Sequence, residues 1–180
     1  MGRNGLDIVG QLEALRRYAR VLTRDPDAAD DLVQATFVRA EERRGTFRDG
    51  ADERVWLMSI LHRLFIDTRR SERTAEAREQ AWAESRPLFV PASGEVAARL
   101  TQVRAAFLAL SAERREALHL VAIEGLGLAE AAEILGVPAG TVMSRVARAR
   151  AELRAFEDGQ VASSGRGLKV VGGRDDRTDR

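Results

Sequence analysis

The chain has 180 residues, of which 44% are hydrophobic, and this is enough for ordinary packed cores in one domain or two small ones. Its formal net charge is only +1, so any affinity for nucleic acid must come from local clusters of basic residues. There is no cysteine, which excludes disulfides and metal sites with thiolate ligands. The two histidines lie far apart in the sequence. We therefore expect no metal and no cofactor.

No apolar run approaches the roughly 20 residues that a helix needs to cross a bilayer. The N-terminus also lacks the basic-then-apolar order of a secretory signal peptide. We expect a cytoplasmic protein without membrane insertion.

The first predicted helix covers residues 7–23 and is amphipathic. Its apolar residues recur at steps of three and four: Ile8, Leu12, Leu15, Ala19 and Leu22. The run Asp25-Pro26-Asp27 ends this helix and provides a start for the next one, because proline cannot continue a helix and aspartate favours turns and N-caps.

The second predicted helix, AADDLVQATFVRAEERR, has an inward set of Ala29, Leu32, Val33, Thr36, Phe37 and Ala40. The residues expected to face outward are Asp30, Asp31, Gln34, Val38 and Glu41. An exposed acidic and amide surface that contains a valine fits a protein partner. It equally fits an acidic first turn favoured by the helix dipole, and periodicity alone does not separate the two readings.

The third predicted helix runs from about residue 52 to 73. Its wide apolar stripe consists of Trp56, Leu57, Ile60, Leu61, Leu64 and Phe65. The opposite side, predicted to face solvent, carries Met58, Ser59, His62, Arg63 and Asp67, and the helix ends in Arg69, Arg70 and Arg73. A basic C-terminus complements the helix dipole, and it also forms a patch suited to phosphates.

Residues 74–95 contain prolines and Gly94 that interrupt any long helix, and we predict a flexible linker there. Helical periodicity returns at Val96, and Ser111 is a plausible N-cap for a further helix that ends near Gly125. Beyond Phe156 the composition changes to Gly, Ser, Asp and Arg, which predicts a disordered tail over residues 157–180.

The sequence pattern of residues 126–156 predicts a helix-turn-helix. Gly136 suits a left-handed C-cap and Pro138 the first turn of the following helix. The buried stripe of that second helix is expected to be Val142, Val146, Ala149, Leu153 and Phe156. Its other face carries a strip of small residues, Gly140, Ser144, Ala147 and Ala151, with Thr141, Arg145 and Arg148 along one edge and Met143, Arg150 and Arg154 along the other. This is the pattern of a recognition helix in the major groove, although an arginine-rich solvated helix has the same pattern.

The predicted fold class is all-α. It consists of two small helical domains, residues 7–73 and 96–156, joined by the linker, and the second is a four-helix domain that ends in the helix-turn-helix. No phosphate loop, nucleophile elbow, metal pair or carboxylate dyad occurs at a useful spacing, so we do not expect an enzyme.

Three motifs in order give the chain a resemblance to the extracytoplasmic-function (ECF) class of bacterial sigma factors in the sigma-70 family. They are AADDLVQATFVRA, WLMSILHRLFIDTRR and GLAEAAEILGVPAGTVMSRVARARAEL, within residues 7–156. The resemblance implies promoter DNA and RNA polymerase core as partners, the latter through the clamp helices of its largest subunit and its beta flap. It also implies an anti-sigma factor and a role in a stress or envelope response.

The resemblance assigns a role to each of three residue sets. Those expected to bind the polymerase clamp are Asp30, Asp31, Gln34 and Val38. Those expected at the minus-ten element, which the chain would help to hold open, are His62, Arg63, Asp67, Arg69, Arg70 and Arg73. Those expected to read the minus-thirty-five element are Thr141, Met143, Ser144, Arg145 and Arg148.

The chain departs from the family pattern at three positions. Ala35 stands where many members have glutamate after the clamp-binding glutamine, and Arg63 stands where asparagine is common. Met143 replaces a frequent lysine, which removes one phosphate contact. Two alternatives stay open: a stand-alone helix-turn-helix regulator, and a sigma-like decoy that sequesters an anti-sigma factor.

Overall fold

The structure is a computed structural model that describes residues 8–48, 50–76 and 95–164. All regular elements in these ranges are helical, in agreement with the predicted all-α class. The first half contains α1 (Ile8–Thr23), α2 (Pro26–Glu42), the short 3-10 helix η1 (Arg44–Thr46) and α3 (Glu53–Glu76). The second contains α4 (Glu95–Ala109), α5 (Ala112–Leu118) with the π-helical turn η2 (His119–Ile123), α6 (Leu128–Leu135) and α7 (Ala139–Ser164).

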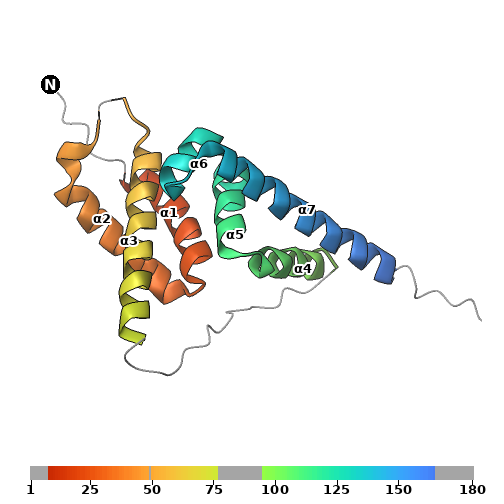
Figure 1. Cartoon of the computed structure of the whole chain (residues 1–180). Helices are drawn as coiled ribbons and strands as arrows, with labels where there is room; N and C mark the ends of the chain where they lie inside the picture. Colours follow the sequence, from red (N-terminus) through yellow and green to blue (C-terminus); the bar gives the residue numbers. More distant parts are fainter. Residues whose placement is uncertain (1–7, 49, 77–94, 165–180) are drawn as a thin grey trace, which may run out of the picture.

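Helices α1, α2 and α3 pack together on one side of the molecule (Figure 1). The Asp25 carboxylate caps α2 by accepting a hydrogen bond from the Ala28 N–H at 2.8 Å, and Pro26 follows in the first turn, as predicted. The predicted inward face of α2 is buried except for Phe37, which is half-buried. Local sequence signals therefore predict the start and the buried face of α2 correctly.

The turn between α6 and α7 has the predicted geometry. Gly136 adopts a left-handed backbone with φ of 63°, and the Val137 N–H donates to the Ala132 carbonyl at 3.2 Å. The predicted stripe of α7 faces the interior, with Val142 and Ala149 fully buried. Helix α7 continues to Ser164, so the prediction of a disordered tail is wrong for residues 157–164, and the rest of that tail lies outside the described residues.

The two halves pack against each other, with α3 against α6 and α1 against α5 (Figure 1). Their buried side chains form one continuous hydrophobic core. The predicted linker lies almost entirely outside the described residues, apart from the last turn of α3 and the first residue of α4.

This packing corrects the prediction that Met58 and His62 face solvent. Met58 is fully buried and His62 is 7% exposed. The reason is that α3 contacts α1 on one side and α6 on another, so it buries more than the single stripe that periodicity assigned to the core.

The core at the boundary between the halves contains a stack of three aromatic rings. The Tyr18 ring lies between His62, with centroids 6.3 Å apart, and His119 of the second half, with centroids 5.6 Å apart. The Tyr18 hydroxyl is 3.0 Å from Nδ1 of His62. Burial lowers the pKa of His62 to about 4, and burial together with the charges of Arg17 and Arg54 lowers the pKa of His119 to about 4. Both imidazoles are therefore neutral at pH 7.

These shifts predict that acid destabilises the fold. Both histidines bind protons in the unfolded chain below about pH 6.5 but not in the folded chain until about pH 4, so the free energy of unfolding falls across this window. Glu116 opposes the trend, because burial raises its pKa to about 7 and the folded chain keeps that proton. The net difference is one proton, or about 1.4 kcal/mol per pH unit between roughly pH 4.5 and 6.5.

Urea unfolding at a series of pH values tests this account. His62→Gln should remove one of the two histidine contributions and make the free energy of unfolding nearly independent of pH in that window. An identical pH slope in the native chain and the variant would contradict the assignment of a neutral, buried His62.

A second prediction concerns the turn before α7. Gly136→Ala should lower the free energy of unfolding by about 1 kcal/mol, because a side chain disfavours the left-handed backbone even though no atom lies within 4 Å of the added Cβ. Gly140→Ala is the matched control, since this open position in the first turn of α7 has helical backbone. It should raise stability by up to about 1 kcal/mol. Equal effects of both changes in urea unfolding would contradict the assignment.

Candidate protein and nucleic-acid interfaces

An exposed strip on α2 consists of Asp31, Gln34 and Val38, which we call the α2 face. The Val38 side chain is 62% exposed, high for a valine in a well-packed half. Asp31 and Gln34 are also exposed, whereas Asp30 is partly covered and accepts a hydrogen bond from Nε of Arg16 at 3.1 Å. The α2 face thus joins an apolar centre to polar groups that remain available to a partner.

The second candidate surface lies along the C-terminal part of α3. Its exposed residues are Arg63, Asp67, Arg69 and Arg70, which we call the α3 basic face. The Arg69 guanidinium lies 5.7 Å from the centre of the Phe65 ring, which holds this cation against the helix. Ile66, 47% exposed, lies within this face and was not predicted to matter. The side chain of Arg73 lies outside the described residues.

His62 does not belong to the α3 basic face. Its ring stacks on that of Tyr18, and its Nδ1 is hydrogen-bonded to the Tyr18 hydroxyl. A buried neutral imidazole offers neither charge nor surface to DNA in this conformation, so the predicted role of His62 at the minus-ten element has no support in this arrangement.

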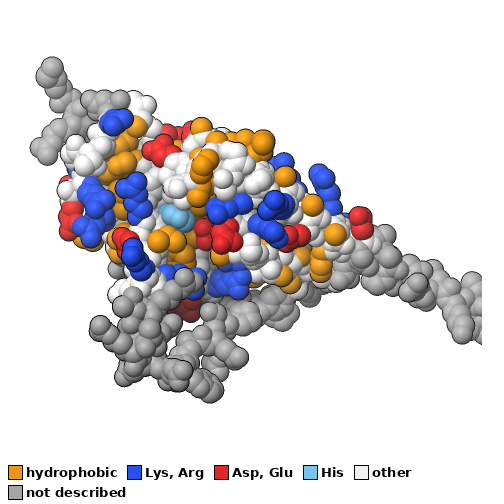
Figure 2. Space-filling model, in the orientation of Figure 1, with side chains coloured by type: hydrophobic (Ala, Val, Ile, Leu, Met, Phe, Trp, Pro, Cys, Tyr) orange, Lys and Arg blue, Asp and Glu red, His pale blue; other side chains and the backbone are white. Residues whose placement is uncertain are grey.

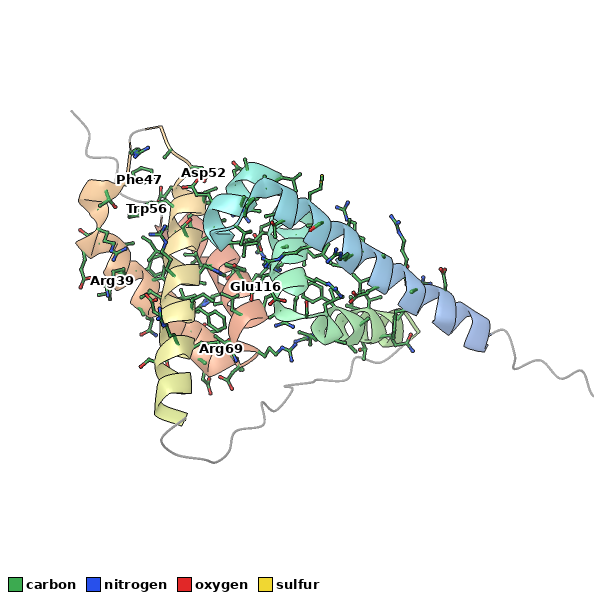
Figure 3. All side chains as sticks on the ribbon, in the orientation of Figure 1. Arg39, Phe47, Asp52, Trp56, Arg69 and Glu116 are labelled. Atoms are coloured by element: carbon green, nitrogen blue, oxygen red, sulfur yellow. The ribbon has the colours of Figure 1, made fainter. Side chains whose placement is uncertain are left out.

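The loop before α3 brings two aromatic rings together. Phe47 and Trp56 are tilted by 59° with centroids 5.2 Å apart, and Figure 3 shows both at the N-terminal end of α3. The helix start is fixed by Asp52, whose carboxylate accepts the N–H of Arg54 at 2.8 Å. The aromatic pair and the α3 basic face thus lie at the two ends of one helix.

The third surface lies near the start of α7. Thr141, Ser144 and Arg145 are half-buried, and Arg148 is exposed. Met143 is 58% exposed. The Ser144 hydroxyl donates to the Thr141 carbonyl at 2.9 Å, so its remaining capacity toward a partner is chiefly as an acceptor. In Figure 2 basic side chains are interspersed with acidic and apolar ones across the visible face, as the low net charge suggests.

A buried carboxyl group lies between the two basic surfaces. Glu116 of α5 is 8% exposed, and burial is the main cause of its raised pKa. The neighbouring Arg115 and, more weakly, Arg145 and Arg69 lower that pKa. Figure 3 shows Arg69 on α3 and Glu116 on α5, on facing sides of the boundary between the halves. Arginines from both basic surfaces therefore share one acidic neighbour.

Sequence reasoning missed a charged cluster at the boundary between the halves: Arg17, Arg54, His119 and Glu124. The side chain of Glu124 has no exposed surface and is paired with both arginines. A lone glutamate within the mostly apolar segment LVAIEGL was the available signal, because an unpaired carboxylate there would be costly. Its partners lie 107 and 70 residues away, too far for periodicity to identify.

Within the described part of the chain, no three His, Cys, Asp or Glu side chains are grouped in a way that suits a metal ion. The described helices also include none with the length and apolar character of a membrane span.

Comparisons with known proteins match both halves. Residues 8–62 match the family model of the sigma2 domain of PhyR, and residues 100–153 match that of sigma-70, region 4. The ECF RNA polymerase sigma factor EcfG of Rhodopseudomonas palustris strain TIE-1 is 37% identical over 152 residues, which are 83% of this chain and 82% of that protein.

Two solved structures resemble this chain in fold. One is the sigma factor RpoE in complex with the anti-sigma factor NepR from Bartonella quintana, with a TM-score of 0.74, 31% identity, and coverage of 84% of this chain and 94% of that one. The other is the anti-anti-sigma factor PhyR with NepR from the same species, with a TM-score of 0.50, 20% identity, and coverage of 79% and 47%. The latter shows a shared fold alone.

The match to EcfG covers 82% of that protein, and the two region models match this chain in order. The first and third motifs lie within the matched ranges, and the second begins within the first of them. The chain belongs to the ECF RNA polymerase sigma factors of the sigma-70 family, which initiate transcription and are not enzymes.

Proposed function

We propose that this sigma factor acts in the cytoplasm by binding RNA polymerase core through the α2 face while its two halves contact the two promoter elements. The observation that carries this proposal is that one packed scaffold exposes the α2 face and the α3 basic face, and at the start of α7 exposes Met143 and Arg148 beside the half-buried Thr141, Ser144 and Arg145. Each surface has the chemistry that its proposed partner requires.

Polymerase docking rests on the α2 face. The exposed Val38 supplies apolar contact, and Asp31 and Gln34 supply an acceptor and an amide beside it. Asp30, partly engaged by Arg16, lies at the edge of this surface. With Ala35 in place of the common glutamate, docking on the clamp helices depends more heavily on Asp31 and Gln34.

Minus-ten recognition combines the α3 basic face with the loop before α3. Holding a separated DNA strand requires cations for the backbone and surfaces on which unstacked bases can rest. Arg63, Arg69 and Arg70 supply cations, Asp67 supplies an acceptor, and the pair Phe47 and Trp56 supplies aromatic surface. Arg73, one turn further along α3, adds a fourth arginine to these cations. No bond-breaking group is needed for strand opening.

Minus-thirty-five recognition rests on the first turns of α7. The buried stripe anchors the helix, and the opposite side presents small residues that permit close approach to a major groove. Arg145 and Arg148 can contact guanine edges or phosphates, and Thr141 can donate to either. Ser144, whose hydroxyl donates to the Thr141 carbonyl, can accept a hydrogen bond from a base amino group. The exposed Met143 contributes apolar contact in place of a phosphate contact.

Regulation by an anti-sigma factor fits the same scaffold. The related RpoE was solved in complex with the anti-sigma factor NepR, and its fold covers 84% of this chain. We infer that such a partner keeps this sigma factor inactive until a stress or envelope signal releases it. The beta flap of RNA polymerase core is the remaining partner that we expect for this chain.

A second candidate function is that of a decoy that binds an anti-sigma factor without supporting transcription. The match of residues 8–62 to the sigma2 domain of PhyR, a protein described as an anti-anti-sigma factor, favours it. The exposed arginines Arg148, Arg150 and Arg154 on α7 argue against it, because a decoy needs no DNA contacts.

Run-off transcription with purified polymerase core on a promoter panel tests the proposed function. Gln34→Ala should weaken core binding and leave DNA contacts intact, whereas Arg148→Ala should leave core binding intact and weaken promoter binding about tenfold, the typical worth of a base contact. Gln102→Ala and Arg20→Ala are matched controls at exposed positions outside the three surfaces and should behave as the native chain does.

Direct binding of the native chain to polymerase core separates the sigma and decoy functions. A sigma factor should bind core and yield transcripts that depend on it. Binding to an anti-sigma factor without binding to core would establish the decoy instead, and binding to duplex DNA without core would establish a stand-alone regulator.

A further inference from the structure

The two halves are joined by a buried carboxylate of the second half that is shared by two arginines of the first. Arg17 of α1 donates from Nε to Oε1 of Glu124 and from Nη2 to Oε2, both at 2.9 Å. Arg54 of α3 donates from Nη2 to Oε2 of the same carboxylate. Glu124 is fully buried, while Arg17 and Arg54 retain 48% and 26% of their side-chain exposure.

Further polar contacts cross the same boundary. Arg24 donates to the Leu108 carbonyl at 2.6 Å, and Arg115 donates from Nε to the Val21 carbonyl at 3.3 Å. Each of these two contacts joins one arginine to a neutral backbone carbonyl rather than to a carboxylate. The paired charges at Glu124 therefore form the strongest polar connection among those described between the halves.

The connection is incompletely satisfied. Nε of Arg54 and both ring nitrogens of His119 are buried and have no hydrogen-bond partner, although Nε2 of His119 is 3.1 Å from Oε1 of Glu124. Separation of the halves would let water satisfy these atoms and solvate the carboxylate. The boundary is thus held by charge pairing, ring stacking and the shared apolar core against a polar desolvation cost, and this opposing cost favours a contact that opens reversibly.

The packed arrangement is too small to contact both promoter elements at once. Elements centred 10 and 35 base pairs upstream are separated by about 85 Å along B-form DNA at 3.4 Å per base pair. A compact chain of this size measures on the order of 40 Å across. Because α3 and α6 are in contact, the two DNA-binding surfaces cannot span that distance without separation of the halves.

We propose that Glu124 is the latch of a closed state of this sigma factor, and that its release from Arg17 and Arg54 allows both promoter elements to be engaged together. The functional part of this inference rests on the proposed function, whereas the latch itself concerns the free protein. The closed state leaves the α2 face exposed, so polymerase binding can precede opening.

The latch predicts how the halves respond to loss of charge. Glu124→Gln keeps the side-chain volume but cannot pair two guanidinium groups, and Arg17→Met removes one partner from a position that is half exposed and tolerant of change. Each should raise the open population about tenfold or more, given the usual cost of breaking a buried ion pair. The double variant should open no further than the stronger single variant, because both changes remove one interaction.

Spin labels report this opening in the free protein. The chain has no cysteine, so Glu42→Cys on α2 and Glu133→Cys on α6, both at exposed positions, give a uniquely labelled pair for pulsed dipolar spectroscopy. We expect one compact distance distribution in the native chain and an added longer, broader component in both latch variants. Glu152→Gln breaks an ion pair with Arg114 inside the second half and should leave the distribution unchanged.

Unchanged distances in Glu124→Gln and Arg17→Met, with helical circular dichroism as in the native chain, would overturn the latch. Arg17→Met serves as the test if Glu124→Gln does not fold. Because neither polymerase nor DNA is present, this result stands apart from the proposed function. Open variants that give no transcript with core would instead reject the sigma function and leave the latch intact.

Discussion

The burial of the Glu124 carboxylate between Arg17 and Arg54 is the constraint on which the arrangement of the two halves depends. A buried carboxylate needs cationic partners, and both of its arginine partners lie in the other half, so this ion pairing exists only when the halves meet. The same contact brings α6 onto α3 and η2 onto α1, which buries the ring stack around Tyr18 and continues one core across the boundary. Separation would expose this stack together with the charges.

Local features of the fold could be predicted from the sequence because they depend on neighbours within a few residues. Asp25 and Pro26 set the start of α2, Gly136 sets the turn before α7, and the inward face of α2 follows from apolar spacing. The extension of α7 to Ser164 could not be inferred from composition, since a polar run with a glycine is also compatible with helix when it continues an existing one. The orientation of the α2 face was predicted for the same local reason.

The failures lie where two distant segments meet. Periodicity gives α3 one buried stripe, but α3 is covered by α1 and α6, so Met58 and His62 lie inside and His62 is lost from the proposed DNA surface. The stacking of Tyr18 on His119 and the pairing of Glu124 likewise involve residues from both halves. For the DNA surfaces, the exposed arginines of α3 and α7 lie as predicted, and their specificity still depends on the DNA that they meet.

The distance between the halves in the promoter complex tests the central claim most directly. Fluorophores at positions 42 and 133 would be compared in the free chain and in a transcription-competent complex with polymerase core and promoter DNA. The account predicts high energy transfer in the free chain and a large loss of transfer in the complex, as Glu124 leaves its arginines and the halves separate along the DNA. High transfer retained in a complex that produces transcript would show that the closed state itself reads the promoter, and would contradict the account.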